Sequence, residues 1–212
     1  MERVKVKICG ITTVVDALVA AEAGADALGF VFWQNSPRYV EPEEAGRITT
    51  ELPPFVKTVG VFVNEAPENI REIITQAGVD CVQLHGEEGP EDAEEVKRAT
   101  GAPVIKAIRM GGQAQLKRLC AYRVSALLLD AYRKGVPGGT GETFDWDLAV
   151  QAEGAGRIIL SGGLNPENVA AAIGRVAPYA VDVSSGVEST PGRKDEEKIK
   201  RFMEEVRKAA RV

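Results

Sequence analysis

Short apolar runs recur along the chain, and the segments between them carry helix start and stop signals. Eight of these runs are rich in β-branched and aliphatic residues, which favours β-strands. The expected strands are Val4–Cys9, Ala27–Phe32, Thr58–Val63, Asp80–His85, Val104–Ile108, Ala126–Asp130, Arg157–Ser161 and Ala180–Ser184. Strands that alternate with helices predict a mostly parallel sheet, because each parallel crossover needs a connection as long as a helix.

The helices are bounded by proline, glycine and capping residues. The prolines expected in first helical turns, where a missing N–H costs nothing, are Pro42, Pro67, Pro90 and Pro166. The glycines expected to end helices in the left-handed conformation are Gly24, Gly78, Gly101 and Gly154. Thr13 with Asp16 is typical of a capping box, and the last helix is expected from about Asp195 to Ala210.

Two architectures fit alternating strands and helices: an open doubly wound sheet and a closed barrel. No Gly-x-Gly-x-x-Gly follows the first strand, where a dinucleotide site would place it. Dividing 212 residues by eight units gives about 26 residues each, close to the minimum for one strand, one helix and two loops. We therefore expect an α/β fold: a single-domain (βα)8 TIM barrel that spans residues 1–212.

Strand alternation tests barrel closure independently. In the first strand Val4, Val6 and Ile8 fall on the outward face, so Lys5, Lys7 and Cys9 face inward. In the last strand Asp182 and Ser184 fall on the inward face. Closure places these two strands side by side, so the sequence predicts an interior pair of Lys7 with Asp182.

Composition narrows the possible partners. Hydrophobic residues are 44% and charged residues 27% of the chain, and no apolar run is long enough to span a bilayer. The net charge of −5, without a basic tract, gives nucleic-acid binding no electrostatic support. The chain starts without a signal peptide, and three widely spaced cysteines predict a reducing, cytoplasmic environment. A single histidine rules out a multi-histidine metal site, so no metal is expected.

The last two strands end in loops suited to a phosphate group. Glycines let the backbone approach an anion closely, and the loops after strands 7 and 8 are the recurrent phosphate site of this fold. Each loop alone would also fit a tight turn, but both occur at the two correct strands. The residues expected to bind phosphate here are Gly162, Gly163, Ser184, Ser185 and Gly186. The long connection 131–145 is expected to act as a lid or binding loop through Gly139, Thr140 and Gly141.

Cys9 and Asp130 are the candidate acid/base pair. A buried cysteine is usually a small apolar filler, but Cys9 faces inward where the first strand ends. Asp130 ends an apolar strand, and a carboxyl group at a partly apolar mouth can act as an acid. Arg38 lies in a polar loop and is either a surface charge or a fork for a carboxylate. His85 is either a substrate contact or a hydrogen-bonded residue of the pore.

An ordered set of motifs spans nearly the whole chain. They are Val6-Lys7-Ile8-Cys9-Gly10-Ile11-Thr12, Gly29-Phe30-Val31-Phe32 with Ser36-Pro37-Arg38-Tyr39, Val59-Gly60-Val61-Phe62-Val63-Asn64, Val82-Gln83-Leu84-His85-Gly86, Leu128-Leu129-Asp130, Gly138-Gly139-Thr140-Gly141 with Phe144-Asp145-Trp146, Leu160-Ser161-Gly162-Gly163-Leu164 and Val181-Asp182-Val183-Ser184-Ser185-Gly186-Val187-Glu188. With these motifs the chain resembles the phosphoribosylanthranilate isomerase family of tryptophan biosynthesis.

The resemblance implies an isomerase. The family carries out an Amadori rearrangement of N-(5-phosphoribosyl)anthranilate to 1-(o-carboxyphenylamino)-1-deoxyribulose 5-phosphate on a (βα)8 barrel. It implies Asp130 as general acid, Cys9 as general base and Arg38 as the contact of the anthranilate carboxylate. The expected partner is therefore a phosphorylated sugar that carries an anthranilate carboxylate. No cofactor, nucleic acid or membrane is expected, and the chain is expected to be a monomer or a homodimer.

Three alternatives remain open from the sequence. An imidazole-pathway isomerase performs the same chemistry, but resembles a duplicated half-barrel, and the chain shows no strong self-similarity of that kind. Indole-glycerol-phosphate synthase relies on a lysine acid, and Lys106 in the fifth strand would be its candidate. A non-catalytic barrel that binds a phosphate ligand is the third, although Cys9 and Asp130 argue against it.

Overall fold

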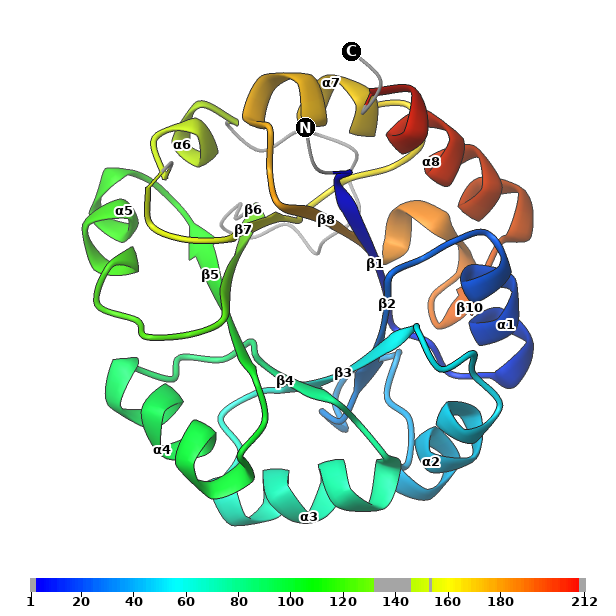
Figure 1. Ribbon diagram of the computed structural model, residues 1–212, viewed down its shortest axis with the longest axis horizontal. Helices are drawn as coiled ribbons and strands as arrows, with labels where there is room; N and C mark the ends of the chain where they lie inside the picture. Colours follow the sequence, from blue (N-terminus) through cyan, green and yellow to red (C-terminus); the bar gives the residue numbers. More distant parts are fainter. Residues whose placement is uncertain (1–2, 132–145, 153, 210–212) are drawn as a thin grey trace.

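A computed structural model of the chain describes residues 3–131, 146–152 and 154–209. Eight parallel strands close into a barrel with helices around it (Figure 1). Neighbouring strands pair in chain order, and the first strand pairs with the eighth. The strands are β1 Lys5–Cys9, β2 Ala27–Val31, β3 Lys57–Phe62, β4 Cys81–Leu84, β5 Val104–Met110, β6 Ala126–Ala131, β7 Ile158–Leu160 and β8 Ala180–Val183. The expected closed (βα)8 barrel is thus confirmed.

A helix lies between most successive strands and packs on the outside of the barrel. The helices are α1 Val14–Glu22, α2 Pro42–Thr50, α3 Pro67–Ala77, α4 Pro90–Thr100, α5 Gln113–Leu119, α6 Trp146–Val150, α7 Val169–Val176 and α8 Glu196–Ala209. Three of the expected prolines open helices α2, α3 and α4. Gly78 and Gly101 end α3 and α4 in the left-handed conformation, as expected. Thr13 accepts a hydrogen bond from the backbone N–H of Asp16 and so caps α1.

One local expectation, the helix start at Pro166, was wrong. Pro166 lies in a turn, and α7 begins three residues later at Val169, because Asn165 and Asn168 first close the turn through their side chains. Lys5 is the register partner of Ala180, which belongs to the cluster inside the barrel, so it shares the expected inward face. Its side chain is 43% exposed at the amino end of β1, where Nζ lies 3.7 Å from Asp26 Oδ1. After β8 the chain forms a short 3-10 helix, η1 (Ser185–Val187), and a two-stranded ribbon of β9 (Glu188–Thr190) and β10 (Arg193–Lys194), which the sequence analysis did not predict.

The barrel has two apolar layers, as strand alternation predicts. Outward side chains such as Val6 and Ile8 join the large core that lies between strands and helices. Inward side chains form a smaller cluster inside the barrel, which includes Ile105, Leu128 and Ile159. This cluster fills the barrel near the amino ends of the strands. Inward polar side chains near the carboxyl ends are therefore left to contact a ligand.

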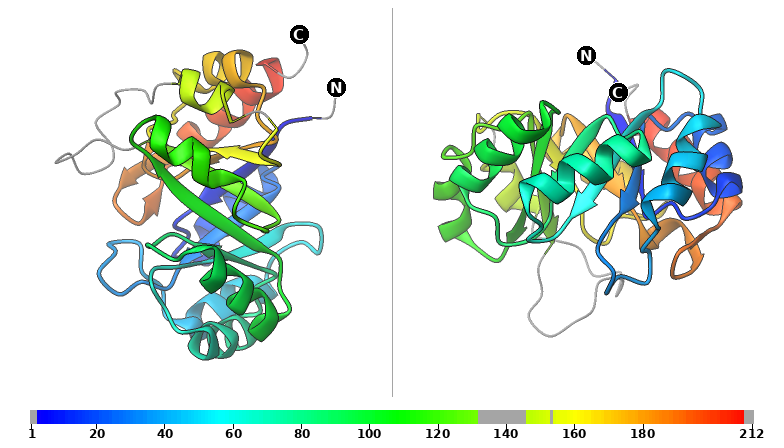
Figure 2. Two further views of the ribbon diagram at one scale, coloured as in Figure 1. Left: turned by 90° about the vertical axis from the view of Figure 1, so that its left-hand side faces the viewer. Right: turned by 90° about the horizontal axis from the view of Figure 1, so that it is seen from below.

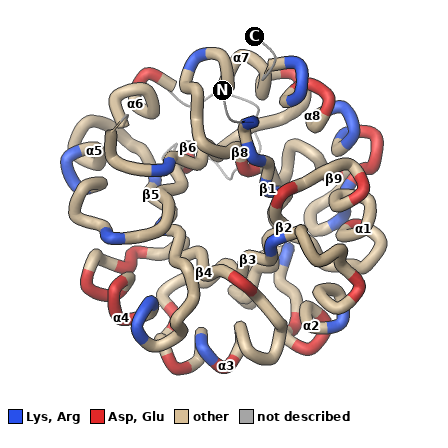
Figure 3. The backbone as a smooth tube through the Cα atoms, in the orientation of Figure 1, with Lys and Arg blue, Asp and Glu red and all other residues tan. Residues whose placement is uncertain are grey.

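Charged residues of both signs lie around the ring of helices (Figure 3). Seen from the side, these helices surround the strands as a single layer (Figure 2). None of the helices in the described part of the chain combines the length and apolar character that a membrane span requires.

Candidate active site

Cys9 and Asp130 reach the same rim of the barrel from different strands. Cys9 ends β1 and packs inside the barrel against Val31 and Val61. Asp130 follows Leu129 near the end of β6, and alternation turns it inward like Leu128. Since all eight strands are parallel, their carboxyl ends meet at one face. The structure therefore brings the thiol and the carboxyl group to the face where barrel active sites lie.

The Cys9 thiol is buried beside the side chain of Lys7. Gly29 on β2 makes room for both, because a Cβ on Gly29 would lie 2.7 Å from Cys9 Sγ and 3.1 Å from Lys7 Cε. Burial raises the pKa of the Cys9 thiol, while the positive charge of Lys7 opposes the rise. A proton acceptor of this kind depends on nearby cations for its thiolate form.

Lys7 and Asp182 form the predicted interior ion pair. They are register partners across the closure of the barrel, and Lys7 Nζ lies 2.8 Å from Asp182 Oδ1. Only 4% and 6% of the two side chains are exposed. Ser161 donates to the other carboxylate oxygen at 3.2 Å. Burial alone would lower the pKa of the Lys7 ammonium, but the charges of Asp182 and Cys9 outweigh it and raise the pKa. Lys7 therefore remains charged inside the barrel.

Asp130 is held by His85 and, through it, by Gln83. His85 Nε2 lies 3.3 Å from Asp130 Oδ2, and Gln83 Nε2 lies 2.9 Å from His85 Nδ1. With the amide oriented this way, a neutral His85 carries its proton on Nε2 and directs it at the carboxylate. About a quarter of each side chain is exposed, 24% for His85 and 26% for Asp130. The carboxyl group is thus oriented by protein and remains open to a ligand.

Arg38 reaches the rim from the loop between β2 and α2 and is fixed by Glu188. Its Nε and Nη2 donate to the two carboxylate oxygens of Glu188 at 2.8 and 2.7 Å. Lys194 Nζ donates to the same carboxylate at 2.9 Å. Sequence reasoning missed both Glu188 and Lys194, because they lie on the β9–β10 ribbon, which follows the last strand of the barrel. The only signal was the acidic residue that ends the final motif, Ser185-Gly186-Val187-Glu188.

The loops after β7 and β8 meet at Gly186. A Cβ on Gly186 would lie 1.9 Å from the carbonyl oxygen of Leu164, so only glycine allows this contact. Gly162 and Gly163 have φ values of 87° and 68°, and the carbonyl of Gly163 accepts from Asn168 at 2.9 Å. The buried Ser184 Oγ has no hydrogen-bond partner among the described residues. Gly139, Thr140 and Gly141 lie outside the described residues.

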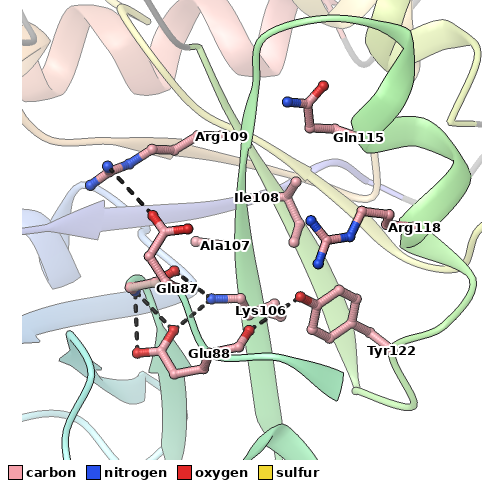
Figure 4. A pocket seen from close by; sticks show the side chains of 10 residues that line it. Glu87, Glu88, Lys106, Ala107, Ile108, Arg109, Gln115, Arg118 and Tyr122 are labelled. Atoms are coloured by element: carbon pink, nitrogen blue, oxygen red, sulfur yellow. Dashed lines mark hydrogen bonds and ion pairs between the residues drawn. The ribbon is translucent and has the colours of Figure 1, made fainter. Parts of the chain in front are cut away.

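Lys106 does not belong to the barrel mouth. It shares the outward face of β5 with Val104 and Met110, which pack in the core between strands and helices. Its Nζ lies 2.6 Å from Glu88 Oε2, at a cavity of about 300 Å³ beside α5 (Figure 4). Only 2% of its side chain is exposed. A lysine held in this way is not placed to act as an acid inside the barrel.

Fold and site together define a (βα)8-barrel enzyme that presents a thiol and a carboxyl group at the carboxyl ends of its strands. Residues 6–205 match the family model of N-(5'phosphoribosyl)anthranilate (PRA) isomerase. The chain belongs to this family of isomerases. Among the described residues, no group of three or more His, Cys, Asp or Glu side chains is arranged to hold a metal ion.

Individual relatives agree over almost their whole length. A curated N-(5'-phosphoribosyl)anthranilate isomerase from Citrifermentans bemidjiense is 58% identical over 208 residues, which cover 98% of this chain and 99% of the relative. The crystal structure of the isomerase from Thermotoga maritima is 49% identical, with a TM-score of 0.91 and coverage of 97% and 99%. A further isomerase structure, in complex with reduced 1-(o-carboxyphenylamino)-1-deoxyribulose 5-phosphate, is 47% identical, with a TM-score of 0.87 and the same coverage.

Proposed function

We propose that the protein converts N-(5'-phosphoribosyl)anthranilate to 1-(o-carboxyphenylamino)-1-deoxyribulose 5-phosphate, a step of tryptophan biosynthesis. The observation that carries the proposal is the shared rim of Cys9 and Asp130 in a chain of the isomerase family. A relative of 47% identity binds the reduced form of this product, which supports the same ligand for this chain.

Asp130 and Cys9 carry the first two proton transfers of the reaction. The Asp130 carboxyl group donates a proton to the furanose ring oxygen, the bond from that oxygen to carbon 1 breaks, and the anthranilate nitrogen forms an iminium with carbon 1. The Cys9 thiolate then removes the proton from carbon 2, whose electron pair flows to the iminium and gives an enolamine. The enolamine tautomerises to the ketone. No net oxidation or reduction occurs, so these steps require neither a metal nor an organic cofactor.

The substrate has two anionic ends, and the rim offers donors for each of them. Arg38 supplies a planar donor fork for the anthranilate carboxylate. The loops after β7 and β8 supply backbone N–H groups for the phosphate, together with Ser185 and the hydroxyl of Ser184, which no described residue binds. Gly139, Thr140 and Gly141 are proposed to complete the binding site from the connection between β6 and α6. Anchoring at both ends orients the sugar between the acid and the base.

The alternatives lack a comparable basis. A synthase that uses a lysine acid would need Lys106 at the mouth, whereas that ammonium is tied to Glu88 outside the strands. The family match covers residues 6–205 and points to an isomerase rather than to a non-catalytic barrel. We place the protein in the cytoplasm, where its free Cys9, Cys81 and Cys120 would stay reduced.

The assembly is proposed to be a monomer or a homodimer. One solved relative, the phosphoribosylanthranilate isomerase of Thermotoga maritima, is described as a dimer from which monomers have been generated. In this chain Phe55, in the loop before β3, is 95% exposed and offers an apolar contact for a second copy. Light scattering at several protein concentrations measures the mass; a stable assembly larger than a dimer would contradict the proposal.

Loss of the fluorescence of the anthranilate substrate tests the activity. Supplied with phosphoribosylanthranilate, the protein should remove the fluorescence and form the deoxyribulose phosphate in equal amount, measured by chromatography. An imidazole-pathway isomerase would consume an aminoimidazole substrate instead, and a binding protein would change the fluorescence without product. Absence of product at micromolar protein concentration would refute the proposed activity.

A further inference from the structure

Glu188 and Lys194 form a buried ionic cluster beside the candidate site. Only 4% of the Glu188 side chain and 1% of the Lys194 side chain are exposed. The carboxylate of Glu188 binds Arg38 through both oxygens and accepts a third hydrogen bond from Lys194. Burial of a carboxylate costs stability unless several donors compensate, and here two cations do so. Their positive charges outweigh the burial and lower the pKa of Glu188, so the carboxylate stays ionised.

The way in which Glu188 holds Arg38 determines which donors of the guanidinium remain. A guanidinium offers one side through Nε and Nη2, and an end through Nη1 and Nη2. Glu188 occupies the side through Nε and Nη2, at 2.8 and 2.7 Å. Among the described residues no hydrogen bond occupies the end of the fork, and 23% of the Arg38 side chain is exposed. Glu188 thus fixes the plane of the guanidinium. The donors that remain, on Nη1 and Nη2, lie next to each other and can bind a second carboxylate through both of its oxygens.

Lys194 connects this carboxylate to the two other parts of the site. Its Nζ donates to the carbonyl oxygen of Cys9 at 2.6 Å and to the carbonyl oxygen of Ser184 at 3.3 Å. Cys9 carries the candidate base, and Ser184 is one of the residues proposed to bind the phosphate. Gly10 brings the same parts together, because a Cβ there would lie 2.6 Å from Arg38 Cδ and 3.2 Å from Ser184 Oγ.

The formal charge of the cluster favours an anion. Two cations, Arg38 and Lys194, share the single carboxylate of Glu188, which leaves one net positive charge. Because the cluster is shielded from water, that charge is weakly screened and attracts an anion at the exposed end of Arg38. The whole chain carries a net charge of −5, so local donors of this kind must provide the attraction.

We propose that Glu188 and Lys194 are positioning residues for recognition of the substrate's aryl carboxylate: Glu188 fixes the end of the Arg38 fork toward that carboxylate, and Lys194 fixes the pair to the Cys9 and Ser184 backbone. The proposal rests on the proposed function, in which Arg38 binds the anthranilate carboxylate. Neither residue exchanges a proton with the substrate.

Kinetics with two substrates test this role. Glu188→Gln should raise KM for phosphoribosylanthranilate about 3- to 10-fold and change kcat less than about threefold, since only charge-assisted orientation is lost. Arg38→Ala should raise KM about 10- to 100-fold, and the double variant should be no worse than Arg38→Ala alone. With the N-phosphoribosyl derivative of aniline, which lacks the carboxylate, Glu188→Gln should leave kcat/KM within about twofold of the wild type.

Glu88→Gln is the matched control. Glu88 is equally buried, with 6% of its side chain exposed, and pairs with Lys106 at 2.6 Å outside the strands. This variant should lower the melting temperature as Glu188→Gln does, yet leave KM within about twofold of the wild type. If Glu188→Gln fails to fold, Lys194→Met is measured in its place. Its loss of kcat/KM should be larger with phosphoribosylanthranilate than with the aniline derivative, beyond the change that both substrates share through Cys9.

The possible failures are distinguishable. An unchanged KM in Glu188→Gln, or equal losses with and without the substrate carboxylate, would overturn the positioning role while Arg38→Ala still raises KM. An unchanged KM in Arg38→Ala would instead refute the assignment of Arg38 in the proposed function, and the positioning role with it.

Discussion

Replacement of Lys7 by methionine tests the buried charge pair inside the barrel. The Lys7→Met substitution keeps an unbranched side chain as far as Cε but leaves the carboxylate of Asp182 without the ammonium, which lies 2.8 Å away in the wild type. Only 6% of the Asp182 side chain is exposed, so water cannot replace the ammonium. Removal of one partner of such a pair costs about 3–5 kcal/mol. For a chain of 212 residues this lowers Tm by roughly 6–20 °C.

The double variant Lys7→Met/Asp182→Asn separates the pair from its packing. Asparagine keeps the acceptor for Ser161, which donates to Asp182 at 3.2 Å, and removes the unpaired charge. It should recover most of the lost stability, because neutral replacement of a whole buried pair is often harmless. Calorimetry at neutral pH measures the melting temperatures of the wild type, the two single variants and the double variant. A single variant that melts within about 2 °C of the wild type, or a double variant less stable than Lys7→Met, would refute the reasoning.

The same substitutions should move the pH profile in opposite directions. In the proposed mechanism activity requires the Cys9 thiolate, so it should rise with pH through the pKa of Cys9. Lys7 lowers that pKa and Asp182 raises it, while Lys194 lowers it. Loss of Lys7 should shift the rising limb of kcat/KM to higher pH, and Asp182→Asn should shift it to lower pH. Iodoacetamide alkylation of Cys9 in a Cys81→Ser/Cys120→Ser background reports the thiolate directly. Shifts in the same direction would contradict this electrostatic role.

Other substitutions test separate parts of the site. Gly186→Ala forces a Cβ against the Leu164 carbonyl, 1.9 Å away, and should cost about 1–3 kcal/mol of unfolding free energy and weaken inhibition by inorganic phosphate; wild-type inhibition would remove that loop from the phosphate site. His85→Asn removes the N–H directed at Asp130 and should lower kcat, but less than Asp130→Asn does; an equal loss would make His85 a proton-transfer group itself. A chelator should leave kcat unchanged, and inhibition by the chelator would contradict a mechanism without metal.

The barrel and its interior pair follow from local patterns in the sequence. The period of the strands turns Lys7 and Asp182 inward, and closure makes them register partners. Pro166 shows the limit of such rules, because the side chains of Asn165 and Asn168 form a turn that delays the helix. The pattern of apolar and polar positions does not show whether this turn or the first turn of the helix forms at Pro166.

The contacts between distant segments could not be predicted from the sequence. Arg38 and Glu188 are 150 positions apart, and their pairing depends on a 3-10 helix and a ribbon with weak sequence signals. Cys9 was identified from its place at a strand end, but the space that Gly29 provides for its sulfur depends on the register of β1 and β2. Strand ends therefore predicted which residues face the mouth, whereas the partners that orient them required the folded chain.

The turnover of Cys9→Ala and Asp130→Asn with saturating phosphoribosylanthranilate tests most directly whether this thiol and this carboxyl group carry the two proton transfers. Each variant should lose about 10²–10⁴-fold in kcat, the usual contribution of general acid/base catalysis. Inhibition by inorganic phosphate should stay at its wild-type value, because neither side chain is proposed to bind the phosphate. A kcat within about tenfold of the wild type in either variant would contradict the assignment of that residue.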